Sequence, residues 1–370
     1  APHAPGGATL ADPALAARLA AVHDPRVDDA AAAVARCEQR AAALGDHLDR
    51  HEETGAGRAA LVADLAAARA RVASLADAGL DAVTLAAVQP ALYAVLARCA
   101  PYYSQGRNID VLETQTDTRT CNLTTLAMVL EGLGKSAADY AGPRDRLLAV
   151  ARYTPYAPRV DAKVAGASQS ADRLTALRLP DFLQLAAIAE CLGSGTADAD
   201  ILAAAQSAWG RIVHEFTIHL HLAQRFGVTG DTRSLAGDFG ALDHVKKSGR
   251  KRVQEVVDAR NHAERTGDAG DQRAYERLRD AEATALGGDA VERDLPLDAY
   301  RDAVLDQVGG ELAAGCGIFM LMAAHYARVQ EVTPDHVVID DPGQHHRSGQ
   351  RVLWPEARAM GYFKKRIAFR

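Results

Sequence analysis

The stretch Thr120-Cys121-Asn122-Leu123-Thr124-Thr125-Leu126-Ala127-Met128 places a cysteine at the start of an apolar segment. Apolar residues recur from there at helical spacing, at positions 123, 126, 127, 130 and 133, and Gly134 is a typical helix stop. Thr120 suits the N-cap position. The positive end of a helix dipole favours a thiolate over a thiol, so the pattern points to Cys121 as a nucleophile. The alternative is a small apolar core residue, the usual place of a free cysteine.

A second informative segment runs from residue 324 to 343 and contains two strand-like stretches around a turn. If this hairpin folds about Thr333, His325 lies directly opposite Asp341, and the two side chains share one face. A bulge or a different loop would shift the register by one residue, which keeps Asp340 as an alternative partner. A carboxylate that fixes the tautomer of an imidazole, together with a thiol at a helix start, gives the parts of a nucleophile–base–orienter triad.

Together, these segments resemble papain-like cysteine peptidases of the bacteriocin-processing type, and more closely the free-standing bacterial and phage members of that group. The resemblance covers residues 101–135 and 308–370. Its motifs are Tyr102-Tyr103-Ser104-Gln105, the stretch from Thr120 to Leu130, the His325 strand, Asp340-Asp341-Pro342-Gly343, and the stretch from Trp354 to Phe363.

The resemblance implies that Cys121 is the nucleophile, His325 the general base and Asp341 the residue that orients the imidazole. A glycine often follows the catalytic cysteine in this family, whereas Asn122 follows it here, as in some free-standing members. The implied fold class is α+β, with the nucleophile on a helix and the base on a sheet.

Papain-like enzymes also carry a glutamine before the cysteine, and its side chain donates to the oxyanion. Gln115 has the usual short spacing to Cys121, while Gln105 has the better sequence context, directly after Tyr-Tyr-Ser. Both remain candidates, and either would act together with the Cys121 backbone N–H. The chemistry needs no cofactor.

Composition restricts the possible classes of function. The chain has 370 residues, of which 48% are apolar, and a net charge of −6 that argues against non-specific nucleic-acid binding. Its five cysteines are scattered, which fits neither a disulfide framework nor a zinc site. No apolar stretch has membrane length, and the first residues lack the pattern of a signal peptide. We expect a protein that is cytoplasmic as made, with a secreted or injected effector as the alternative.

Changes along the sequence divide the chain into an all-helical N-terminal accessory region, 1–100, and a papain-like domain, 101–370. In the first region Leu61, Leu65, Val72 and Leu75 share one helical face. Within the second, residues 135–308 include a large helical insertion whose part from Lys246 to Asp294 is highly charged, which is typical of an exposed helix or loop.

Smaller features predict secondary structure within the second domain. Residues 199–226 should form one or two helices. The C-terminal segment 365–369 reads as an edge strand because it carries lysines.

Two further groups of histidines do not indicate a metal. His214 and His219 are one residue too far apart for the zinc-peptidase spacing, which requires histidines four positions apart. We therefore interpret His219 as a core or solvent-exposed residue. His345, His346 and Arg347 lie in a glycine-flanked segment that reads as a polar loop.

The sequence thus predicts a cysteine peptidase that hydrolyses peptide or isopeptide bonds of a protein or peptide substrate, with a toxin-like effector as one role open to it. One alternative is another acyl transfer on the same triad: deamidation, transglutamination or cleavage of a peptidoglycan amide. The other is a catalytically inactive binding module. Nothing in the sequence indicates an oligomeric state or a membrane or nucleic-acid partner.

Overall fold

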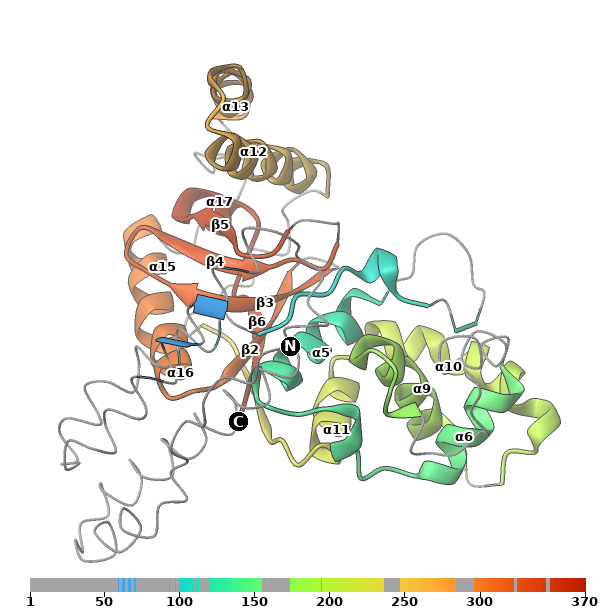
Figure 1. The fold of residues 1–370 in the computed structure, drawn as a ribbon. Coiled ribbons are helices and arrows are strands. Elements are labelled where there is room, and N and C mark those ends of the chain that lie inside the picture. The colour runs from blue at the N-terminus through green and yellow to red at the C-terminus, as the bar shows by residue number, and fades with distance from the viewer. Residues whose placement is uncertain are drawn as a thin grey trace, which may run out of the picture.

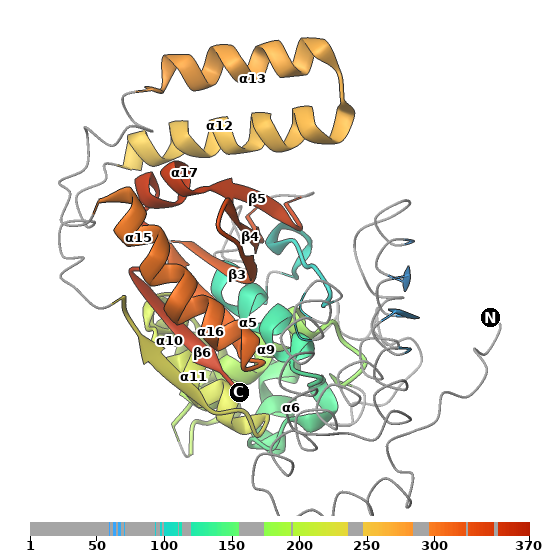
Figure 2. The same ribbon diagram turned by 90° about the vertical axis from the view of Figure 1, so that its left-hand side faces the viewer.

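An antiparallel sheet covered by helices on both faces forms the part of the chain that the computed structural model describes, so the fold class is α+β (Figures 1 and 2). The described residues are 59, 62–63, 66–67, 70, 93, 97, 100–109, 111–112, 120–154, 174–193, 195–235, 247–283, 296–322, 325–343 and 347–370. The predicted helices of residues 1–100, with their apolar face at positions 61, 65, 72 and 75, lie almost wholly outside them.

The sheet has six strands in the order β1-β6-β2-β3-β4-β5, and each neighbouring pair is antiparallel. The strands are β1 (Gly230–Arg233), β2 (Gly317–Met322), β3 (His325–Val332), β4 (His336–Asp340), β5 (Gln350–Leu353) and β6 (Lys365–Phe369). Residues 365–369 form a strand, as predicted, but the prediction that this strand lies at an edge of the sheet is wrong. A segment from the middle of the chain, β1, pairs with β6 from the outside and becomes the edge in its place.

The first group of helices packs on one face of the sheet and is drawn in green and yellow in Figure 1. It consists of α5 (Cys121–Gly132), α6 (Arg144–Tyr153), α9 (Leu179–Cys191), α10 (Ile201–His214) and α11 (Thr217–Arg225), with 3-10 turns at Gln105–Arg107, Ala137–Asp139 and Asp198–Asp200. Residues 199–226 thus contain two helices.

The opposite face of the sheet packs on a second group of helices. This group contains α15 (Leu297–Val304), a π-helical turn (Leu305–Gly309), α16 (Gly310–Ala313) and α17 (Trp354–Ala359). Alternation along β2 separates the two cores: Phe319 points to the first group, whereas Ile318 and Met320 point to the second. This two-sided burial explains why β2 reads as a continuous apolar stretch.

Helix α5 is the central element of the first group. Its residues 122–131 are all buried, and it contacts β2, β3, α9 and α11. The helix ends in a Schellman motif, in which Gly134 has φ +76° and the N–H groups of Gly134 and Lys135 donate to the carbonyls of Glu131 and Leu130. The predicted stop at Gly134 is therefore confirmed. Thr120 occupies the N-cap position, but its side chain makes no capping hydrogen bond.

The charged segment predicted as an insertion forms a helical hairpin of α12 (Lys247–Thr266) and α13 (Ala269–Ala281), which lies beyond α17 and β5 (Figure 2). Val253 and Val257 of α12 pack into the core of the second group, and Val256 packs against Tyr275 of α13. Asn261 accepts from the N–H of Arg351 and donates to its carbonyl, so α12 covers the open edge of β5. No helix in the described ranges is long and apolar enough to cross a membrane.

Candidate active site

Cys121 is the first residue of α5, as the sequence predicts, and its side chain is half-buried. Backbone N–H groups in the first turn of a helix have no intrahelical acceptor, so this helix end presents donors and a positive dipole end around the thiol. The helix cannot shift easily, because it is buried over ten residues. The fold therefore holds the sulfur rigidly at the boundary between the helices and the sheet.

His325 begins β3 and pairs with Met322 across the β2–β3 ladder. Its Nε2 contacts Oδ1 of Asp341, and Cys121 is close enough to influence the charge of the ring. Burial alone would lower the pKa of His325, but the charge and hydrogen bond of Asp341, followed by those of Cys121, raise it to about 10. The imidazole is thus cationic at neutral pH.

Asp341 follows directly after β4 and is almost fully buried, with 1% of its side chain exposed. Oδ1 accepts from His325 and from the N–H of Gly343 at 2.7 Å, and Oδ2 accepts from Nη1 of Arg347 at 2.7 Å. Burial alone would raise the pKa of this carboxyl, but His325, Arg347 and the Gly343 N–H hold it well below its usual range. Asp341 is therefore ionised and fixed in position.

The predicted hairpin register is wrong, although the predicted contact is present. The turn spans Thr333 to His336, and a bulge at Gln330 interrupts the ladder, so that Arg328 lies opposite Asp340. Continued by one residue, this register places Asp341 opposite position 327, diagonally from His325. The error amounts to two positions, which preserves the face of the sheet, and a diagonal pair on one face is still within reach.

Asp340 points to the other face and does not contact His325. It accepts from Nε of Arg328 at 2.7 Å and also contacts Gln330, Ser348 and the Gly349 N–H. Both Asp340 and Arg328 are buried, so they form an internal ion pair. The structure thus associates Asp341, and not the alternative Asp340, with the imidazole.

The arrangement of the ring nitrogens defines a possible reaction geometry. Because Nε2 of His325 is engaged by Asp341, Nδ1 remains to exchange a proton with Cys121. A thiol, an imidazole and a carboxylate in this order can perform nucleophilic acyl transfer. Among the described residues, no group of histidine, cysteine, aspartate and glutamate side chains could hold a metal ion.

The two glutamine candidates differ in what the structure describes. Gln105 lies in the 3-10 turn next to the Asp341 loop, and its N–H donates to the carbonyl of Pro342 at 2.8 Å. The Tyr102 hydroxyl donates to the carbonyl of Asp341 at 2.9 Å, so this segment runs beside the triad. Gln115 lies outside the described residues.

Sequence reasoning missed the role of Asn122 and His219 behind the cysteine. Nδ2 of Asn122 donates to the carbonyl of Ile212 at 2.7 Å and lies 3.0 Å from Nε2 of His219. Nδ1 of His219 donates to the carbonyl of Phe216 at 2.9 Å, so its Nε2 is the acceptor. Burial lowers the pKa of His219 to about 4, which keeps it neutral. This buried network ties the start of α5 to α10 and α11.

The sequence pattern favours a polar loop around Arg347, whereas the Arg347 side chain contacts Asp341 directly in the structure. Its Nη2 donates to Oδ2 of Asp258 on α12 at 2.6 Å, and only 14% of its side chain is exposed. No local pattern identifies this role, because the two carboxylates come from positions far apart in sequence. A buried arginine between two carboxylates is visible only in three dimensions.

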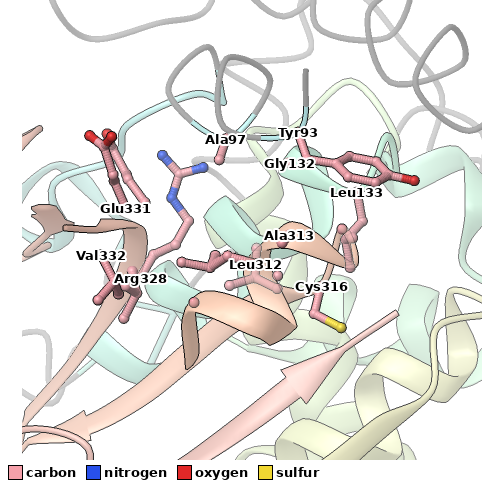
Figure 3. A pocket seen from close by; sticks show the side chains of 16 residues that line it. Tyr93, Ala97, Gly132, Leu133, Leu312, Ala313, Cys316, Arg328, Glu331 and Val332 are labelled. Atoms are coloured by element: carbon pink, nitrogen blue, oxygen red, sulfur yellow. The ribbon is translucent and has the colours of Figure 1, made fainter. Parts of the chain in front are cut away.

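A cavity of about 190 Å³ lies at the opposite end of α5 from Cys121. Figure 3 shows Tyr93, Leu133, Leu312 and Cys316 among its labelled side chains. Val129, another lining residue, is eight positions after Cys121, which corresponds to about 12 Å along the helix axis. This cavity is therefore separate from the triad.

Comparison of the chain with protein-family models, with curated proteins and with solved structures gives no match. These comparisons therefore indicate no function, and only the chemistry of the candidate site bears on it.

Proposed function

We propose that the protein is a papain-like cysteine peptidase that hydrolyses peptide or isopeptide bonds of a protein or peptide. The observation that carries this proposal is the contact of His325 with Asp341, together with Cys121 at the start of a buried helix and close enough to act on the charge of the His325 ring. The placement of the thiol on a helix and the imidazole on the adjoining sheet agrees with the papain-like layout.

In the proposed reaction, the Cys121 thiolate attacks the carbonyl carbon of the scissile amide and the carbonyl oxygen becomes an oxyanion. The His325 imidazolium then gives its proton to the leaving nitrogen, the C–N bond breaks, and an amine and a thioester remain. A water molecule next loses a proton to His325 and attacks the thioester. The product is a carboxylic acid, and the thiolate–imidazolium pair is restored.

The oxyanion needs hydrogen-bond donors at the helix start. The Cys121 backbone N–H supplies one, because it lies in the first turn of α5. The second is the side-chain amide of Gln105 or Gln115. The position of Gln105 beside Pro342 supports it as a candidate from the neighbouring segment.

Proteome-wide mapping of new N-termini tests the proposal, with wild-type protein compared with Cys121→Ala. Peptide hydrolysis predicts new N-termini with wild-type protein only. Deamidation would change the mass of a substrate and leave its chain whole, and transglutamination would join two chains. An inactive binding module would produce none of these changes.

A further inference from the structure

Arg347 links the candidate triad to the charged helical hairpin. Its side chain bridges two carboxylates, with Nη1 2.7 Å from Oδ2 of Asp341 and Nη2 2.6 Å from Oδ2 of Asp258. Its backbone carbonyl also accepts from the N–H of Asp341 at 3.2 Å. Arg347 thus holds Asp341 through both its main chain and its side chain.

The outer carboxylate is itself fixed by α12 and β5. Oδ1 of Asp258 accepts from Nε2 of Gln350 at 2.6 Å and from Nε2 of Gln254 at 3.0 Å. The same helix is anchored by a buried ion pair between Arg260 and Glu356, 2.8 Å apart. Asp258 is therefore a rigid support for Arg347.

We propose that Arg347 is a positioning residue for the Asp341–His325 pair, and that Asp258 makes the α12–α13 hairpin part of this support. The inference rests on the proposed function insofar as it assigns the pair a role in catalysis. It extends that function by giving the charged insertion a task in the reaction.

The physical reason is the change of charge during the reaction. When His325 gives its proton to the leaving group, Asp341 loses the positive charge of the imidazolium while it remains 1% exposed. A buried carboxylate without a cationic partner is energetically unfavourable. Without a second cation, the negative charge of Asp341 would therefore keep the proton on His325. Arg347 supplies that cation throughout the cycle and partly neutralises the charge of Asp341. It thereby lowers the affinity of His325 for its proton.

Within the described part of the chain, the other charged or titratable groups around the pair do not replace this cation. Cys121 acts on the ring from α5 and carries no positive charge in either protonation state, and Tyr362 lies near Asp341 with a pKa raised by burial. Tyr102 reaches the Asp341 carbonyl through its hydroxyl. Among the cations of the described residues, those with a side-chain contact to the Asp341 carboxylate are His325 and Arg347.

An NMR titration of the His325 ring tests the proposal without a substrate. The wild-type protein is compared with Arg347→Gln, and a His325→Gln spectrum identifies the signal among the 13 histidines. Removing the arginine charge should raise the pKa of His325 by about one pH unit. Asp258→Asn should shift it in the opposite direction, because the arginine then keeps its charge without the outer carboxylate.

Opposite shifts separate an electrostatic role from general damage, which would move both variants alike. The matched control is Arg351→Gln, which removes a nearby arginine that pairs with Glu264 and not with Asp341. This control should leave the His325 titration unchanged. Asp258 is 35% exposed, so Asp258→Asn provides the test even if Arg347→Gln does not fold.

Peptide hydrolysis supplies the second readout. Arg347→Gln should lower kcat about tenfold with little change in KM, since the positioning acts on the chemical step. Equal pKa values of His325 in the wild-type protein, Arg347→Gln and Asp258→Asn would overturn the inference, even if the wild-type protein cleaves peptides. Opposite shifts in a protein that cleaves no amide would instead support the electrostatic coupling and contradict the proposed function.

Discussion

Replacing His219 by glutamine should make the free energy of unfolding less dependent on pH in the acidic range. The native environment holds the pKa of His219 at about 4 through burial, whereas an unfolded histidine has a pKa of about 6.5. Between these values the unfolded chain binds more protons than the native one, so stability falls as the pH falls. Protonation would also place an N–H of His219 against the donating amide of Asn122.

The size of the effect follows from the same two values. A difference of about 2.5 pH units corresponds to about 3 kcal/mol at about 1.4 kcal/mol per unit. Wild-type protein should therefore lose about 3 kcal/mol more than His219→Gln between pH 7 and pH 4.

Urea unfolding at several pH values across this range measures the difference directly. The control is His221→Gln, which removes a half-exposed histidine from the same helix. Parallel profiles of the wild-type protein and His219→Gln would refute the reasoning, because they would mean that His219 does not stay neutral in the native state.

Three further predictions concern a glycine with positive φ, the two neighbouring aspartates and the oxyanion donor. Gly315→Ala should lower the free energy of unfolding by about 1–3 kcal/mol, since φ is +82° and the new Cβ would lie 2.7 Å from the Tyr93 ring. The control is Gly310→Ala, at a helical position with open space, which should be neutral or slightly stabilising. Asp340→Ala should lower the free energy of unfolding by roughly 3–5 kcal/mol, because it leaves the buried Arg328 cation without a carboxylate partner. Asp341→Ala should mainly lower turnover, and by less than Cys121→Ala does. Gln105→Ala should reduce peptide turnover on the order of a hundredfold if the Gln105 side chain donates to the oxyanion. Near wild-type rates for both Gln105→Ala and Gln115→Ala would exclude both glutamines as oxyanion donors.

Local patterns predicted the elements around the candidate site well. The cysteine at a helix start and the stop at Gly134 follow from apolar spacing and from cap residues, which depend on sequence neighbours only. The contact between His325 and Asp341 followed from strand alternation. It survived a wrong register because the error was an even number of residues.

Long-range relationships were not predictable in the same way. The position of β6 inside the sheet depends on its pairing with β1, which lies more than a hundred residues earlier. Arg347 and Asp258, or Asn122 and His219, likewise meet only because distant helices pack against the site. A single sequence contains no periodicity that reports such pairs.

Competitive alkylation of the native protein tests the central claim most directly. A limiting amount of alkylating agent is added at neutral pH to the wild-type protein and to His325→Ala, and the adduct is located among the five cysteines. The account predicts preferential labelling of Cys121 in the wild-type protein and a marked loss of that preference in His325→Ala. Faster labelling of Cys99 or Cys316, or equal labelling of Cys121 in both proteins, would contradict an imidazole-activated thiol at the start of α5.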